Sequence, residues 1–106
     1  MADAKEQVVE GHLTKQVIVE MFGYARRLAG DREAVLDLDR EGTMRDVVIA
    51  LGSKYPSLMG PIIQPDTQEL VSPFFLNVNG RRVVDDFDAI PRDGERLILF
   101  FVDAGG

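Results

Sequence analysis

The chain has 106 residues, of which 45% are hydrophobic, and this is enough for one domain with a single core. Its net charge of -6 argues against nucleic acid as a partner, because phosphate binding needs a clustered basic surface, and instead favours attraction to a basic protein surface. Without cysteine, a membrane-length apolar run or a signal-peptide pattern, the chain is expected to be cytoplasmic and to form no disulfide or thiolate site.

Residues 1–15 are polar and lack a sustained period, so we expect a flexible N-terminal extension or a strand added at an edge of the sheet. His12 is the only histidine, and without a cysteine or a second histidine it is expected to be solvated and not a ligand or base. The segment 15–24 then has the β-branched content of a strand with two alternating faces. The face expected to be more exposed to solvent carries Ile18, Glu20 and Phe22.

Residues 33–39 alternate in the same way and predict a second strand. Its expected apolar contacts come from Val35, Leu36 and Leu38. The connection at 25–31 is short, with one helical turn expected around Arg26 to Leu28, so the two strands should form a hairpin.

The clearest helix of the sequence begins after residue 42. Thr43 is a good N-cap and Asp46 stands three residues later, as in a capping box that also favours the positive end of the helix dipole. Pro56 ends the helix, because the residue before a proline avoids the α region. An apolar stripe at helical spacing is expected to pack in the core and consists of Met44, Val47, Val48, Leu51 and Tyr55.

The segment 57–73 contains prolines and apolar anchors, and is expected to be a packed loop with a short helical turn. Residues 74–78 predict a third strand. Asn79-Gly80 is the strongest hairpin pattern in the chain and favours a type I′ turn into a short fourth strand.

The apolar run 97–102 carries large side chains on both alternating faces, which is typical of a strand in the middle of a sheet. Almost without a spacer, the chain then reaches Ala104, Gly105 and Gly106. Two residues without a Cβ can enter a narrow channel of a partner protein that is closed to residues with side chains. We therefore predict a mobile tail in which Ala104 and Gly105 thread the channel and Gly106 acts through its terminal carboxylate.

Motifs of the common enzyme classes are absent from the sequence. It has no glycine-rich phosphate loop, no dinucleotide fingerprint, and no serine or cysteine placed with a histidine partner. Asp85, Asp86 and Asp88 lack the remaining ligands of a calcium loop, so a solvated turn is expected in place of a metal site. These absences predict a protein that is not itself an enzyme.

The predicted order of strand, strand, helix, strand, short strand and strand indicates an α+β fold of the β-grasp type, a mixed β-sheet with one main helix packed across it. Several short motifs match the MoaD family in order and spacing: Phe22 with Arg26-x-Leu28-Ala29-Gly30, Thr43-x-x-Asp46-Val47 through Leu51, Tyr55-Pro56-x-Leu58, Leu76 to Gly80, Asp93-Gly94-Glu95, and Gly105-Gly106. The chain therefore resembles the MoaD-like sulfur carriers. These are ubiquitin-like proteins related to ThiS, and MoaD is the small subunit of molybdopterin synthase.

The resemblance covers residues 17–106 and implies a β-grasp domain at 16–102, between the extension at 1–15 and the tail at 103–106. It also implies that an E1-like adenylating enzyme, similar to MoeB, activates the Gly106 carboxylate with ATP and that sulfur then replaces AMP. A carboxylate with a pKa of roughly 3.5 is anionic and unreactive at neutral pH, so it needs such a leaving group. The thiocarboxylate would supply a MoaE-like large subunit in molybdenum cofactor biosynthesis, and the carrier itself would bind no cofactor.

Three alternatives remain open at the level of sequence. The Gly106 acyl group can be attacked by a lysine, as in a ubiquitin-like modifier, or the sulfur can go to another acceptor in tRNA thiolation, thiamine synthesis or cysteine synthesis. The third alternative is a β-grasp interaction module that is not reactive. For any of these, an apolar patch on the uncovered sheet face is expected to bind the partner, and its residues are Ile18, Phe22, Ile98 and Phe100.

Overall fold

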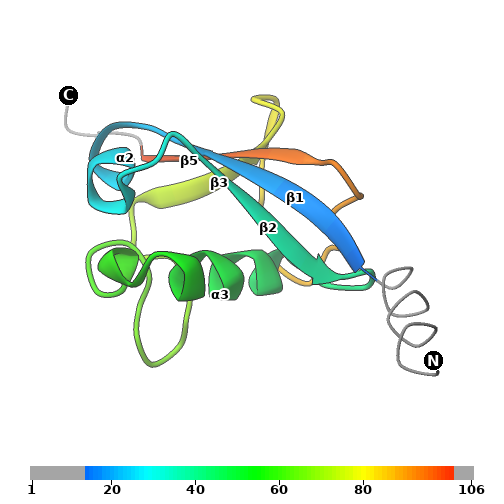
Figure 1. Cartoon of the computed structure of the whole chain (residues 1–106), viewed down its shortest axis with the longest axis horizontal. Helices are drawn as coiled ribbons and strands as arrows, with labels where there is room; N and C mark the ends of the chain where they lie inside the picture. Colours follow the sequence, from blue (N-terminus) through cyan, green and yellow to red (C-terminus); the bar gives the residue numbers. More distant parts are fainter. Residues whose placement is uncertain (1–13, 102–106) are drawn as a thin grey trace, which may run out of the picture.

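The computed structural model describes residues 14–101. The elements in chain order are β1 (Thr14–Met21), α2 (Gly23–Ala29), β2 (Glu33–Asp39), α3 (Met44–Lys54), the 3-10 turn η1 (Pro56–Leu58), β3 (Phe74–Val78), β4 (Arg82–Val83) and β5 (Arg96–Phe101). The strands form one mixed sheet in the order β2-β1-β5-β3-β4, in which only β1 and β5 are parallel. Helix α3 lies across one face of this sheet (Figure 1). The predicted α+β architecture of the β-grasp type is confirmed.

The first hairpin is present, but its connection differs from the prediction. β1 starts at Thr14, inside the predicted extension, and ends at Met21 because residues 23–29 form the seven-residue helix α2 where a single turn was expected. Gly30 ends α2 in the left-handed region at φ 81°, and its N–H donates to the Arg26 carbonyl at 2.8 Å. The rest of the predicted extension, including His12, lies outside the described residues.

The face of β2 that packs on the core is set by its pairing with β1. Val19 lies opposite Ala34, so the buried positions of β2 are Ala34, Leu36 and Leu38. The expectation that Val35 contributes to the core is wrong, because it alternates with these residues and is 44% exposed. Val35 lies on the uncovered face of the sheet instead.

Helix α3 follows the predicted pattern closely. The Thr43 N–H donates to Asp46 Oδ2 at 2.9 Å, and the Asp46 N–H donates to Thr43 Oγ1, which completes the capping box. All five residues of the predicted apolar stripe are buried, and they pack on the helix-covered face of the sheet. Satisfied end groups and one apolar face together explain why this segment is helical.

Replacing Leu51 by Ala is expected to lower the free energy of unfolding by about 2–5 kcal/mol, because Leu51 has no exposed surface and its removal leaves a cavity. Ile49 on the same helix is 38% exposed, so Ile49→Ala should cost less than about 1 kcal/mol. Denaturant unfolding of both variants measures the difference. Equal losses would mean that α3 does not pack on the sheet through Leu51.

Tyr55 joins the end of α3 to the loop before β2. Its buried hydroxyl donates a hydrogen bond to Asp31 Oδ2 at 2.7 Å. Burial, and then the bond to the Asp31 carboxylate, raise the pKa of Tyr55 from 10 to about 12. The folded state therefore holds the phenol proton more tightly than the unfolded chain does.

This difference predicts a loss of stability at alkaline pH. The raised pKa of Tyr55 adds about 1–3 kcal/mol to the free energy of unfolding. This stabilisation is complete below pH 10 and disappears as the pH rises through about 12. Tyr55→Phe should remove this part of the pH dependence. The difference in free energy of unfolding between the original protein and the variant should therefore become smaller as the pH rises from 10 to about 12. Urea unfolding at a series of pH values measures it, and a gap that stays constant from pH 9 to about 12 would refute the role of the hydroxyl.

The second half of the chain also follows the sequence pattern. The predicted packed loop contains the turn η1, and Ile62 and Ile63 within it have no exposed surface. Asn79 and Gly80 have φ angles of 54° and 73°, as a type I′ turn requires, so the predicted β3–β4 hairpin is confirmed. β5 occupies the middle of the sheet, and two of its residues, Leu97 and Leu99, are completely buried in the core.

Lys15 is a buried cation at the start of β1, within the segment predicted to be an extension. Its Nζ donates to the Gly42 carbonyl at 2.8 Å and to the Pro91 carbonyl at 2.7 Å. Burial lowers the pKa of Lys15 even though Asp46 and Asp93 act in the opposite direction. The side chain therefore ties β1 to the loop before α3 and to the loop before β5.

Candidate functional site

The site predicted from the sequence has two parts, a tail and a sheet face. The tail residues Ala104, Gly105 and Gly106 lie outside the described residues. Phe101 is the last described residue and pairs with Phe74 of β3, with ring centroids 5.3 Å apart. The chain is therefore held in the sheet by β3 up to five residues before Gly106.

The second part is the sheet face opposite α3, which no described element covers (Figure 1). Ile18 of β1 and Ile98 and Phe100 of β5 lie on this face and are half-buried. Phe22 continues the alternation of β1 beyond its last residue and is 49% exposed. The structure thus brings the four predicted partner-binding residues onto one face, and their binding role stays a prediction.

Three further apolar residues lie on this uncovered face and were not predicted as part of it. Phe75 of β3 lies opposite Phe100, with ring centroids 6.0 Å apart. Val35 of β2 and Val83 of β4 are both 44% exposed. The alternation of each strand contains this information, but the adjacent pairs of apolar residues in β2 and β3 leave the inward face undecided without the pairing register.

One ionic group interrupts the apolar surface of the uncovered face. Arg96 Nη1 donates to Glu20 Oε2 at 2.5 Å and to Glu33 Oε2 at 2.8 Å. Hydrogen bonds to Glu33 and then Glu20 raise the pKa of Arg96, which therefore stays charged. The guanidinium links β5 to β1 and β2, so the three side chains are held in a fixed arrangement on the face.

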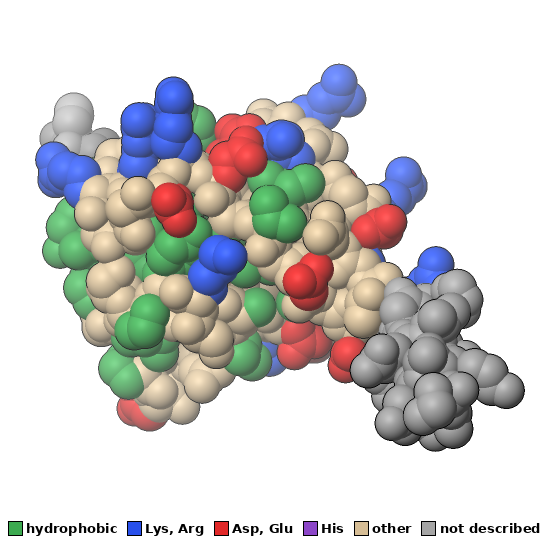
Figure 2. Space-filling view, viewed as in Figure 1, with side chains coloured by type: hydrophobic (Ala, Val, Ile, Leu, Met, Phe, Trp, Pro, Cys, Tyr) green, Lys and Arg blue, Asp and Glu red, His purple; other side chains and the backbone are tan. Residues whose placement is uncertain are grey.

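A basic region lies beside the sheet end from which the tail leaves. Arg26, Arg27 and Arg32 line a shallow depression at α2, and Arg27 lies 5.9 Å from the ring centroid of Tyr24. Helix α2 also contacts β5. Figure 2 shows Lys and Arg side chains projecting along the upper side of the molecule, above the sheet. Although the chain has a net charge of -6, this local excess of arginine makes the surface at α2 positively charged.

Among residues 14–101, no group of three or more His, Cys, Asp or Glu side chains is placed to hold a metal ion. The aspartates considered in the sequence have other contacts. Asp86 Oδ1 accepts the Asp88 N–H at 3.0 Å, and Asp88 pairs with Arg45 at 3.1 Å. Within the same range, no helix is long and apolar enough to cross a membrane.

A five-stranded mixed sheet that packs on one main helix, with the last strand in its centre, defines a ubiquitin-like β-grasp protein. Comparison with protein-family models finds no match, and comparison with curated protein sequences also finds none. Comparison with solved structures does find relatives.

The small archaeal modifier protein SAMP1 from Haloferax volcanii is 25% identical, with a TM-score of 0.74 over 86% of this chain and 99% of that one. A candidate molybdopterin converting factor subunit 1 from Pyrococcus furiosus is 23% identical, with a TM-score of 0.67 over 82% and 97% of the two chains. Ubiquitin from Caldiarchaeum subterraneum, 16% identical with a TM-score of 0.52 over 88% and 99%, shares the fold alone. The predicted resemblance to ubiquitin-like proteins is confirmed by SAMP1, and the molybdopterin converting factor, at 23% identity, shows the same fold.

Proposed function

We propose that this protein is a cytoplasmic sulfur carrier whose Gly106 carboxylate is adenylated and then converted to a thiocarboxylate. The observation that carries the proposal is the position of β5. This strand is paired on both sides from Leu97 to Leu99, and Phe100 and Phe101 continue the pairing with β3, so residues 102–106 follow directly from a strand that is held in the sheet. A short Gly-Gly tip on a rigid base presents its terminal carboxylate at a defined distance from the domain.

The chemistry needs an activating enzyme, because a free carboxylate does not react with sulfur nucleophiles. Its oxygen attacks the α-phosphorus of ATP, which forms an acyl adenylate and releases pyrophosphate. A sulfide-level donor then attacks the carbonyl carbon, AMP leaves, and a thiocarboxylate and a proton are formed. The carrier supplies the acyl group and the fit to its partners, and the enzyme supplies the catalysis.

The length of the tail limits where that enzyme can bind. Five fully extended residues span at most roughly 18 Å, so the nucleotide must lie within that distance of the end of β5. The uncovered face and the α2 arginines are the surfaces next to this end. We therefore assign Ile18, Phe22, Ile98 and Phe100 to the docking of an E1-like, MoeB-like enzyme, with Gly105 and Ala104 in its channel.

The molybdopterin converting factor among the structural neighbours supports a finer assignment. In this assignment the chain is the small subunit of molybdopterin synthase, and a MoaE-like large subunit takes its sulfur for the molybdenum cofactor. Binding to that subunit is expected to use the same tail, since only one carboxylate carries the sulfur.

A second candidate is supported by structural neighbours that are small archaeal modifier proteins. In a modifier, the activated Gly106 carbonyl is attacked by a lysine amine of another protein, which forms an isopeptide bond and releases the leaving group. The two functions share the activation step and differ in the nucleophile that ends the reaction.

The proposal is tested by measuring the intact mass of the protein after incubation with an E1-like enzyme, ATP and a sulfur donor. Loading should make the protein roughly 16 Da heavier, because sulfur replaces one oxygen of the carboxyl group. The gain should require ATP. A mass that stays unchanged with an active enzyme that loads its own carrier would favour the interaction module instead.

A further inference from the structure

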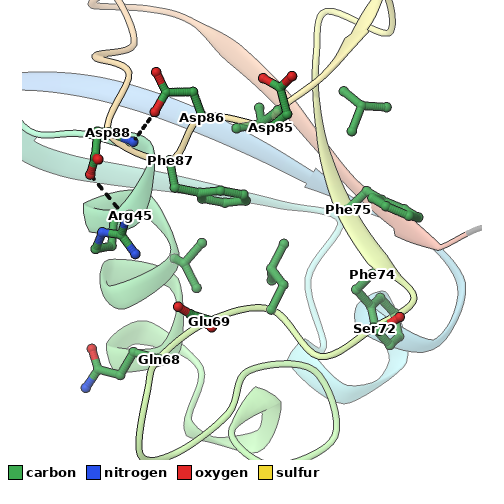
Figure 3. Close-up of a pocket in the computed structure, with 14 residues that line it drawn as sticks. Arg45, Gln68, Glu69, Ser72, Phe74, Phe75, Asp85, Asp86, Phe87 and Asp88 are labelled. Atoms are coloured by element: carbon green, nitrogen blue, oxygen red, sulfur yellow. Dashed lines mark hydrogen bonds and ion pairs between the residues drawn. The ribbon is translucent and has the colours of Figure 1, made fainter.

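A cleft of about 690 Å³ lies between α3 and the β4 edge of the sheet (Figure 3). Its floor is apolar and is formed by Val48, Leu70, Phe74 and Phe87. The Phe87 ring stands in the middle of the cleft, with Phe74 and Phe75 across from it on β3. Neither the tail nor the docking residues proposed above use this cleft.

The walls of the cleft are held by backbone hydrogen bonds. On one side, the Met44 N–H donates to the Ala89 carbonyl at 2.8 Å and the Arg45 N–H donates to the Phe87 carbonyl at 2.9 Å. On the other side, the Val71 N–H donates to the Ile62 carbonyl at 2.7 Å. Both walls are thus fixed to the domain, and the cleft exists before any ligand binds.

A strand edge opens into this cleft. β4 pairs only with Asn77 and Val78, and the Val84 N–H adds one bond to the Leu76 carbonyl before the chain turns away. No described strand lies on that side of Phe74 and Phe75. By the alternation of the strand, the Phe74 N–H and carbonyl point to the same side as the Leu76 carbonyl, but the Phe74 N–H already donates to the Val71 carbonyl at 2.9 Å, so the edge offers an incoming chain only the Phe74 carbonyl.

The rim of the cleft is acidic. Four carboxylates line it, those of Glu69, Asp85, Asp86 and Asp88, against the single cation Arg45, which already pairs with Asp88. Four carboxylates and one arginine leave the lining of the cleft with three more negative than positive charges. An incoming segment therefore gains from positive charge.

We propose that the cleft binds a basic segment of another protein, which lies beside Phe74 and places one bulky apolar side chain against Phe87. The aromatic floor receives the apolar anchor, and the carboxylates on the rim receive flanking Lys or Arg side chains. This surface is separate from the tail, so the carrier can hold such a partner while Gly106 is engaged elsewhere.

The charge of the remaining sequence favours another protein over this chain as the source of the segment. Residues 1–13 contain three acidic residues and one lysine, and residues 102–106 contain one aspartate and no basic residue. Neither segment complements an acidic rim. A second copy of a chain with net charge -6 is repelled by it as well.

The probe for the test is the capped peptide Arg-Val-Arg-Phe-Arg-Val-Arg, titrated into the full-length isotope-labelled chain and followed by amide chemical shifts. We expect the largest changes at Leu70, Phe74, Val84 and Phe87, and binding that weakens with added salt. Two matched peptides test the two parts of the proposal. One has Glu in place of each Arg, and the other has Ala in place of Phe, which removes the apolar anchor. Both should bind at least about tenfold more weakly.

Variants of the chain separate the cleft from general charge effects. The triple substitution Glu69→Gln, Asp85→Asn and Asp86→Asn should weaken the basic peptide by about tenfold, because exposed ion pairs each contribute modestly. The control Asp37→Asn with Asp39→Asn removes charge from β2, far from the cleft, and should change binding less than about twofold.

Three results would overturn the proposal. The first is shift changes centred on the uncovered face in place of the cleft. The second is equal weakening by the cleft variant and the β2 control. The third is concentration-dependent shifts at Leu70 and Phe87 without any peptide, which would assign the cleft to a second copy of the chain.

Discussion

Deleting Gly106 is expected to abolish thiocarboxylate formation, with loading at least about a hundredfold below that of the intact chain. The reacting carboxylate would move to Gly105, one residue and roughly 3.5 Å short of the nucleotide. Such a displacement is large compared with the precision that acyl transfer needs, since misplacement by about 1 Å can cost a hundredfold in rate. Appending one residue after Gly106 should have the same effect, because a side chain then stands at the reacting end.

Neither change should affect folding. The core consists of residues between Val17 and Leu99, and the last described residue, Phe101, precedes the deleted position by five residues. The melting temperature should therefore stay within about 2 °C. Deleting Met1 is the matched control at the other terminus and should leave loading unchanged. Normal loading of the Gly106 deletion would refute the role of the terminal carboxylate.

Replacing Phe100 by Asp is expected to weaken binding of the activating enzyme by about 10–100-fold. Phe100 lies in the middle of the apolar group on the uncovered face, beside Phe75, and a buried carboxylate at a docked interface would lose its hydration. Phe22→Asp should act in the same direction with less risk to folding, because Phe22 is 49% exposed. Binding can be measured by titrating each variant into the enzyme.

The matched control for the face is Ile49→Asp, which places the same charge on the exposed side of α3. It should leave enzyme binding within about twofold of the original value. Unfolding of the domain by both Phe22→Asp and Phe100→Asp would show that these residues belong to the core. Equal binding by all three variants would remove the uncovered face from the docking surface.

The elements whose bounds are set by short-range sequence patterns, such as caps and turns, were predicted well from the sequence. The Thr43–Asp46 capping box and the Pro56 stop set the bounds of α3, and Asn79-Gly80 set the β3–β4 turn. Each of these depends on residues within one turn of the chain. The central position of β5 was also predictable, because a strand with large apolar residues on both faces needs neighbours on both sides.

The misplaced features depend on contacts between distant segments. Lys15 can be buried because its Nζ donates hydrogen bonds to the carbonyls of Gly42 and Pro91, far along the chain, and nothing near it in the sequence indicates this. Val35 was assigned to the core because two apolar residues stand side by side in β2. Only the pairing of Val19 with Ala34 decides between them.

The candidate site divides in the same way. Parity along β1 and β5 was enough to place Ile18, Ile98 and Phe100 on one face. Phe75 required the register between β3 and β5, and the cleft beside Phe87 required the meeting of α3, β4 and the 68–72 loop, which no local pattern encodes.

The sulfur-carrier proposal is tested most directly by locating the added mass within the loaded protein. Trypsin cleavage after Arg96 releases the peptide 97–106, which contains the complete tail and β5 without its first residue. Fragmentation of this peptide should place a gain of roughly 16 Da on the terminal residue, Gly106, as expected for a thiocarboxylate in place of a carboxylate. A loaded protein whose terminal residue keeps its original mass, or whose added mass lies on any other residue, would contradict the proposal.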